Sequence, residues 1–241
     1  MNKRTMLIAY IVLLHLCLGA LVARPVLRRL QRHRGGAAAR VYRYEDRLRV
    51  HQRIDAAVPA GAVLCFGDSF TAGLCTLTFS KEAVNFGLGS DTVDDIRRRL
   101  GRYTSLERCA AVVLAAGFND LLSEPADRTG ERYRLLLQEL PSEVPIVVCG
   151  VLPVDPGGRS RPDNAEIAAL NRRIAELCAG EDRWHYLQPP RGLTDDTGAL
   201  RRDVHDGDGV HLNAQGYAIW AAALRTALAE ALGGSTDESS L

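Results

Sequence analysis

Short apolar runs alternate with longer amphipathic segments from Gly61 onward, and this alternation constrains the fold more than any other feature of the chain. The runs are four to seven residues long and rich in Val, Ile, Leu and Ala, which is typical of strands buried on both faces. The predicted strands cover residues 62–66, 83–86, 110–116, 146–151 and 184–187.

The segments between these runs place apolar residues at helical spacing. Helices are predicted over residues 93–100, 133–140, 164–177 (after an Asp163-Asn164 cap) and 217–228. Strands that alternate with helices form parallel sheets covered on both faces. We therefore predict an α/β fold over residues 61–232, a three-layer α/β/α domain with a five-stranded parallel sheet, followed by a flexible tail at residues 233–241.

The N-terminal segment is different, because residues 6–23 contain no Asp, Glu, Lys or Arg. As a helix these 18 residues would be about 27 Å long, close to the minimum for crossing a bilayer core. Signal cleavage after Ala20 or Ala23 would place Leu18 or Leu21 at the −3 position, where a small residue is required. A cleaved signal peptide and a buried core helix are alternatives, but we favour a single-pass anchor over residues 1–23.

Charge is unevenly distributed along the chain. Residues 1–57 contain 12 Lys/Arg and 3 Asp/Glu, whereas residues 58–241 contain 18 Lys/Arg and 26 Asp/Glu. The acidic body argues against nucleic-acid binding. Residues 24–60 read as a basic helical stalk, which either is solvated or contacts anionic lipid headgroups. Arginines after the apolar segment favour a cytoplasmic body by the positive-inside rule.

The six cysteines match no zinc-binding spacing, and most fall in apolar segments as small filler. A disulfide between Cys65 and Cys75 is compatible with an oxidising compartment. Neither a metal nor a cofactor is predicted.

Three short motifs carry residues suited to chemistry. The strand at 62–66 runs into Gly67-Asp68-Ser69, the strand at 110–116 runs into Gly117-Phe118-Asn119-Asp120, and Asp208-Gly209-Val210-His211 precedes the last helix. A serine hydroxyl is a poor nucleophile without a base, and His211 could be that base. Asp208 could orient the imidazole. Donors for an oxyanion could come from the Ser69 N–H, the Asn119 amide and the glycine-rich turn at residues 87–90.

Together these motifs resemble the SGNH hydrolases, also called GDSL esterases and lipases, over about residues 61–232. The resemblance includes Leu212-Asn213 and Gly216-Tyr217 after the histidine. It implies a flavodoxin-like SGNH hydrolase fold with Ser69 as nucleophile, Asp208 and His211 completing a triad, and Asn119 as an oxyanion donor. The chain departs from the family pattern at Ser90, where a glycine donor is expected, so either Ser90 or Gly89 supplies that N–H.

Neighbouring polar residues have structural interpretations. Asp68 and Asp120 are predicted to brace turns or cap helices, and residues 97–99 are predicted to form a solvated arginine face. His205 is not predicted to be catalytic, because Arg202 occupies the position three residues before it.

The predicted function is a membrane-anchored serine esterase. The short predicted loops offer no lid, which favours short-chain or small soluble esters. One alternative is an acyltransferase that uses the same triad to modify a sugar or lipid hydroxyl, so the partner is either a small ester or an acylated saccharide or lipid. An inactive binding module is a further alternative. The family resemblance favours an extracytoplasmic body, in opposition to the flanking charges.

Overall fold

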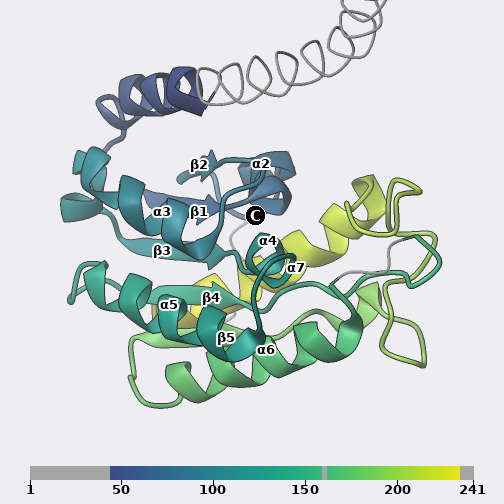
Figure 1. The fold of residues 1–241 in the computed structure, drawn as a ribbon. Coiled ribbons are helices and arrows are strands. Elements are labelled where there is room, and N and C mark those ends of the chain that lie inside the picture. The colour runs from purple at the N-terminus through teal and green to yellow at the C-terminus, as the bar shows by residue number, and fades with distance from the viewer. Residues whose placement is uncertain (1–43, 159–161, 234–241) are drawn as a thin grey trace, which may run out of the picture. The chain divides into compact units, whose positions relative to one another are not determined.

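The computed structural model describes residues 44–158 and 162–233 (Figure 1). The chain divides into two compact units, residues 1–50 and residues 51–241. In the first unit residues 44–50 are helical, and in the second residues 51–55 are helical. The predicted span at residues 6–23 lies outside the described residues, as does most of the predicted tail. Among the residues described, none of the helices has the length and apolar character needed to cross a membrane.

A parallel sheet forms the centre of the second unit. Its five strands lie in the order β2-β1-β3-β4-β5, and every neighbouring pair is parallel, which confirms the predicted sheet. This order places a topological switch between β1 and β3, where ligands bind in open α/β sheets. The strands are β1 (Val63–Gly67), β2 (Ala83–Gly87), β3 (Ala111–Ala115), β4 (Ile146–Cys149) and β5 (Trp184–Leu187).

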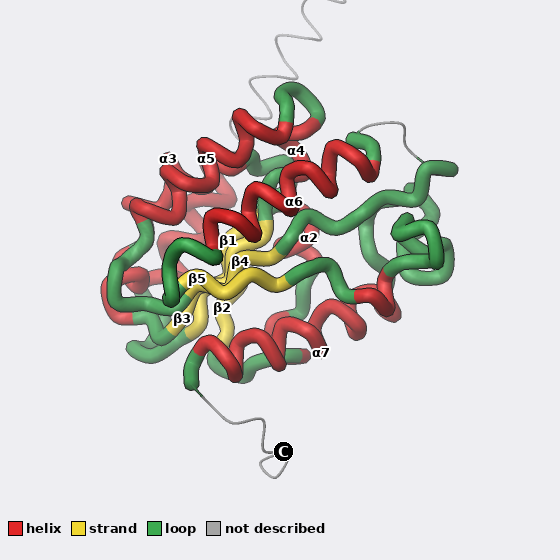
Figure 2. The backbone as a smooth tube through the Cα atoms, turned by 90° about the horizontal axis from the view of Figure 1, so that it is seen from below, coloured by secondary structure: helices red, strands yellow, loops and turns green. Residues whose placement is uncertain are grey.

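Helices cover both faces of this sheet. Figure 2 shows α3, α5 and α6 on one side of the strands and α7 on the other. The predicted three-layer arrangement is therefore confirmed. The helices are α2 (Ser69–Gly73), α3 (Val93–Arg99), α4 (Phe118–Leu121), α5 (Ala126–Glu139), α6 (Asn164–Cys178) and α7 (Ala214–Ala231).

Local sequence explains where two of these helices begin. Asp163 caps α6, and its side chain accepts a hydrogen bond from the Glu166 N–H while Glu166 reaches back to the Asp163 N–H. Thr92 and Asp95 form the same reciprocal capping box at the start of α3. Such a box satisfies backbone donors that a helix leaves unpaired in its first turn. The Asp163 cap agrees with the sequence prediction.

Part of the predicted stalk belongs to the second unit. Asp55 is buried, and its carboxylate accepts hydrogen bonds from the N–H groups of Thr104 (2.8 Å) and Ser105 (3.1 Å). His51 Nδ1 lies 3.0 Å from the hydroxyl oxygen of Tyr103. These contacts attach residues 51–55 to the rest of the second unit, which therefore begins within the segment 24–60 that the charge pattern assigns to the stalk.

The cysteines of the described residues are all free. Cys65 is fully buried in β1, whereas Cys75 is exposed, so the two do not form the disulfide considered from the sequence. Burial raises the pKa of the Cys65 thiol to about 12. Cys65 is therefore an apolar filler of the sheet, as its strand position predicts.

Candidate active site

Ser69 lies where β1 turns directly into α2. Gly67 is the last residue of β1. No side chain fits at this position, because a Cβ there would lie 2.0 Å from Thr71 Oγ1. Asp68 then caps α2, and its Oδ1 accepts a hydrogen bond of 3.0 Å from the Phe70 N–H. This tight strand-to-helix turn leaves Ser69 half-buried as the first residue of α2.

His211 precedes α7 and links Ser69 to Asp208. Its Nε2 lies 3.1 Å from Ser69 Oγ, and its Nδ1 lies 2.6 Å from Asp208 Oδ2. Both distances are within hydrogen-bond range. The structure therefore brings together the three side chains predicted to form the triad, although Ser69 and His211 are 142 residues apart in the chain.

Asp208 accepts hydrogen bonds on both carboxylate oxygens. Oδ1 accepts from the N–H groups of Val210 (2.9 Å) and His211 (2.8 Å), while Oδ2 faces the His211 ring. Partial burial alone would raise the pKa of Asp208, but the hydrogen bonds from the His211 ring and the two N–H groups outweigh it and lower the pKa to about 2. A carboxylate at this place holds the imidazole proton on Nδ1, so Nε2 is free to accept a proton from Ser69.

The turn after β2 carries the two backbone candidates for the oxyanion site, Gly89 and Ser90. Ser90 has a φ of 73°, and among the described residues it is the only non-glycine residue in the left-handed region. Glycine adopts this conformation most readily, which accounts for a glycine at this place in the family pattern. The Leu88 N–H donates to the Gly67 carbonyl oxygen at 2.9 Å, so this turn is tied to the end of β1.

Asn119 lies in α4, which follows β3, and its side chain contacts the same turn. Its Nδ2 donates a hydrogen bond of 3.0 Å to the Asp91 carbonyl oxygen. An amide nitrogen carries two hydrogens, so one can brace the turn while the second serves a ligand. The predicted oxyanion residues thus follow three neighbouring strands, with Ser69 after β1, Gly89 and Ser90 after β2, and Asn119 after β3.

Arg99 is buried, so the solvated arginine face predicted for residues 97–99 is wrong at this position. Its side chain is 2% exposed, and its Nε lies 2.8 Å from Asp91 Oδ2. Its Nη1 donates to the Tyr103 hydroxyl oxygen at 2.7 Å, and its guanidinium carbon lies 5.4 Å from the centroid of the Phe66 ring. A buried charge of this kind persists when it is paired and hydrogen-bonded, and the sequence pattern did not reveal these partners.

Two more carboxyls near the site, Asp68 and Asp120, are buried. Asp120 Oδ2 accepts a hydrogen bond of 3.0 Å from the Val93 N–H, at the first residue of α3. Burial raises the pKa of Asp68 to about 7 and the pKa of Asp120 to about 6. Both side chains bind backbone N–H groups, which agrees with the bracing roles predicted for them.

One polar pair near the triad does not follow from the sequence pattern. His205 Nε2 lies 3.4 Å from Asp155 Oδ2, and both residues are buried. Arg202 occupies the position three residues before His205, so the local sequence offers this histidine no acid. The actual carboxylate comes from the loop after β4, and no local spacing rule connects that loop to residue 205.

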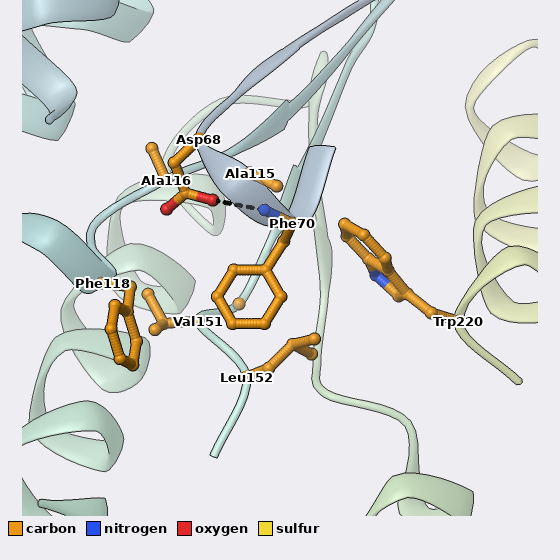
Figure 3. Close-up of a pocket in the computed structure, with 9 residues that line it drawn as sticks. Asp68, Phe70, Ala115, Ala116, Phe118, Val151, Leu152 and Trp220 are labelled. Carbon is orange, nitrogen blue, oxygen red and sulfur yellow. Dashed lines mark hydrogen bonds between the residues drawn. The ribbon is translucent and has the colours of Figure 1, made fainter. Parts of the chain in front are cut away.

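A small cavity is lined by Asp68 and Phe70, the neighbours of Ser69 in the chain, and by Phe118, the neighbour of Asn119 (Figure 3). Its volume is about 10 Å³, roughly the space that one water molecule requires. The Phe70 ring centroid lies 5.8 Å from that of Phe118 and 5.7 Å from that of His211. Figure 3 labels the lining residues Asp68, Phe70, Ala115, Ala116, Phe118, Val151, Leu152 and Trp220.

Solved structures share this fold. A GDSL-like lipase from Bacteroides thetaiotaomicron is 21% identical, with 76% of this chain and 98% of that chain covered at a TM-score of 0.65. The lipase/acylhydrolase from Enterococcus faecalis is 22% identical, with 72% and 96% covered at a TM-score of 0.62. The acetyl xylan esterase AlAXEase is 20% identical, with 69% and 99% covered at a TM-score of 0.56.

No curated protein sequence matches the chain. A family model does match it over residues 65–219, a range that contains Ser69, Asn119, Asp208 and His211. Because that range covers more than half of the sequence, this chain belongs to the GDSL-like Lipase/Acylhydrolase family.

Proposed function

We propose that this protein is a serine esterase that cleaves carboxylic esters through an acyl-enzyme. Ser69 Oγ attacks the ester carbonyl carbon while His211 Nε2 takes its proton, and the same proton is then given to the departing alcohol. Water, deprotonated by His211, releases the acid and restores Ser69. The observation that carries this proposal is the unbroken series of contacts from Ser69 Oγ through His211 to Asp208.

The tetrahedral intermediate needs donors for its negative oxygen, and the proposed donors are the Ser69 N–H, the N–H groups of the Gly89–Ser90 turn and the Asn119 amide. Support comes from the bond between Asn119 Nδ2 and the Asp91 carbonyl, which fixes the amide against the turn. Donors fixed before the reaction stabilise the developing charge at no cost of reorganisation.

The substrate in this proposal carries a short acyl group. Phe70 and Phe118 adjoin Ser69 and Asn119 in the chain and are both buried, and the small cavity that they line offers no space for a long acyl chain. One similar structure is described as an acetyl xylan esterase. We expect kcat/KM to be highest for acetyl and propionyl p-nitrophenyl esters and to fall steadily as the acyl chain is lengthened. A maximum at eight or more carbons would contradict this part of the proposal.

Membrane attachment is a second part of the proposal and is supported by the uncharged segment at residues 6–23 and its basic flanks. We expect the full-length protein to fractionate with membranes and to resist extraction by high salt. The arginines favour a cytoplasmic catalytic unit, and the family resemblance favours an extracytoplasmic one. A C-terminal reporter that is active only outside the cytoplasm distinguishes the two.

Labelling with a fluorophosphonate probe tests the nucleophile directly. We expect the full-length wild type to be labelled, Ser69→Ala to be unlabelled, and Ser142→Ala, a change at an exposed serine, to be labelled like the wild type. Equal labelling of wild type and Ser69→Ala would overturn the proposal, as would an unlabelled wild type.

A further inference from the structure

The loop of residues 203–213 carries both Asp208 and His211, and it closes on itself through backbone hydrogen bonds. The Asp206 N–H donates to the His211 carbonyl oxygen at 2.8 Å. The Asp208 and His211 side chains are 42% and 41% exposed, so packing covers them only partly. Polar contacts within the loop must therefore contribute to fixing their positions.

The ring of His205 lies at the centre of this loop and is buried. Its Nδ1 accepts hydrogen bonds from the N–H groups of Gly207 (2.9 Å) and Gly209 (3.2 Å). Both glycines have positive φ, 93° and 78°, which lets the backbone curl around the ring. The two bonds hold the residues on either side of Asp208.

These two bonds also fix which nitrogen of His205 carries the proton. A backbone N–H can only donate, so Nδ1 must present a lone pair, and the proton of the neutral ring sits on Nε2. That nitrogen is buried and makes no hydrogen bond to the described residues, but it lies 3.4 Å from Asp155 Oδ2, within the range of a charge contact. A carboxylate at this distance favours a proton on Nε2 and so leaves Nδ1 as the acceptor.

Asp155 is itself joined to the loop. Its N–H donates to the Gly209 carbonyl oxygen at 2.9 Å, and its Oδ1 accepts from the Gly157 N–H at 2.9 Å. The contact between the two segments is close, because a Cβ on Gly158 would lie 2.7 Å from the Asp208 carbonyl oxygen. The Asp155 segment therefore supports the backbone of Asp208 directly.

We propose that Asp155 and His205 form a second carboxylate–histidine pair that positions the loop carrying Asp208 and His211. Both are positioning residues, since their contacts run through the backbone of the loop and not to the reacting atoms. Asp155 selects the His205 tautomer, and His205 Nδ1 then holds the two N–H groups that flank Asp208. The inference rests on the proposed function, because the loop matters for catalysis only if Asp208 and His211 act there.

Two variants of similar shape separate the acceptor from the bulk of the ring. In His205→Asn the Oδ1 atom takes the place of Nδ1, whereas His205→Leu has the same branched shape without an acceptor. In full-length protein we expect His205→Leu to lower kcat on p-nitrophenyl acetate about 10- to 100-fold, with a parallel loss in the rate of fluorophosphonate labelling and little change in KM, because small misplacements of catalytic groups are costly. We expect His205→Asn to keep kcat within about threefold of the wild type.

The proposal is overturned if a folded His205→Leu keeps wild-type kcat, or if His205→Asn loses as much activity as His205→Leu. Circular dichroism and the melting temperature report whether each variant folds. A general loss of stability would lower the melting temperature in both variants without the rescue by Asn.

A direct reading of the tautomer does not depend on activity. In long-range ¹H–¹⁵N spectra of wild-type protein labelled at histidine, we expect the His205 signal to show protonated Nε2 and unprotonated Nδ1. The signal is assigned by its absence from His205→Asn. Protonated Nδ1 in the wild type would refute the pair. If the fluorophosphonate probe fails to label the wild type but His205 shows the expected tautomer, the proposed esterase is rejected while the His205 geometry stands.

Asp155→Asn examines the carboxylate separately. If the asparagine Oδ1 still accepts from the Gly157 N–H, its NH2 group faces His205 Nε2. Two N–H donors then point at each other, which disfavours a proton on Nε2. We expect the His205 signal of this variant to show a mixture of the two tautomers. We expect kcat to fall with the fraction of rings that are protonated on Nε2. An unchanged tautomer with unchanged kcat would show that Asp155 does not set the ring.

Discussion

The two sides of the proposed triad are built in different ways. Ser69 sits on a turn between a buried strand and a helix, where Gly67 leaves no space and Asp68 is 1% exposed. His211 and Asp208 sit on an irregular loop and are both about two-fifths exposed. The nucleophile therefore takes its position from the sheet, whereas the base takes its position from polar contacts among loop residues.

This difference predicts different consequences for mutation. A change beside Ser69 disturbs packing that the whole unit shares, so global stability and activity fall together. A change in the loop of residues 203–213 disturbs local hydrogen bonds, so activity falls more than stability.

Asp208→Asn should have the largest effect on activity. An asparagine Oδ1 can still accept from the N–H groups of Val210 and His211, which leaves its NH2 group facing His211 Nδ1. The ring then carries its proton on Nε2, where it no longer accepts the proton of Ser69. We expect kcat to fall by about 10³- to 10⁴-fold, measured on p-nitrophenyl acetate.

The melting temperature of Asp208→Asn should stay close to that of the wild type if the loop is energetically separate. Asp206→Asn, a change at an exposed neighbour on the same loop, provides the control and should keep kcat within about twofold. A loss of less than tenfold in Asp208→Asn would contradict the assigned role of the carboxylate.

Alanine at Gly67 and at Gly209 compares the two sides with the same substitution. At Gly67 the new Cβ would meet Thr71 and the Ala115 carbonyl oxygen at 2.0 and 2.3 Å, and we expect a loss of about 3 kcal/mol or more in the free energy of unfolding. At Gly209 the φ of 78° and a contact of 2.9 Å with the Gly158 Cα predict a loss of about 1–2 kcal/mol.

Urea denaturation and kcat of both variants decide the comparison. We expect Gly67→Ala to reduce stability and activity together, and Gly209→Ala to reduce kcat while most of the stability is retained. Equal losses of stability at the two glycines would show that the triad loop and the sheet unfold as one unit.

The parts of the fold and site that depend on residues close together in the chain could be predicted from the sequence. The strand before Gly67, the serine on the turn and the Asp163 helix cap each follow from residues adjacent in the chain. Asp208 and His211 could also be predicted, because Asp208 lies only three positions before His211 in the chain. All of these depend on short-range geometry that a single sequence contains.

The interactions that the sequence did not predict join residues that are distant in the chain. Arg99 reads as part of a solvated helix face, yet Phe66 and Tyr103 enclose it and Asp91 pairs with it. His205 finds its carboxylate in the loop after β4. Whether such a charge is buried depends on which segments the fold brings together, and hydrophobic periodicity does not encode that.

Asp68→Asn tests whether the buried, ionised carboxyl of Asp68 lowers the free energy of unfolding. The pKa of Asp68 is raised to about 7, above the usual value of about 4 for an unfolded chain. The folded state therefore binds more protons between these pH values, and the free energy of unfolding falls as pH rises from about 4 to about 7. Asparagine keeps the acceptor for the Phe70 N–H without this titration.

We expect Asp68→Asn to remove a decline of about 2 kcal/mol between pH 5 and pH 7, measured by urea denaturation at several pH values. Asp120→Asn should flatten the curve up to about pH 6, where its own raised pKa lies. Asp196→Asn, at an exposed position, is the control. A wild type whose stability rises over this range would refute the burial cost assigned to Asp68.

Ser90→Gly should have the smallest effect and concerns the turn that faces Ser69. A serine at φ 73° is strained relative to glycine, although glycine loses more entropy on folding, so we expect a net gain of about 0.5–1 kcal/mol in the free energy of unfolding. If this turn contributes only backbone N–H groups, kcat should stay within about twofold of the wild type. A tenfold fall in kcat with normal stability would instead show that the Ser90 hydroxyl takes part, and the oxyanion site would then depend on an exposed side chain.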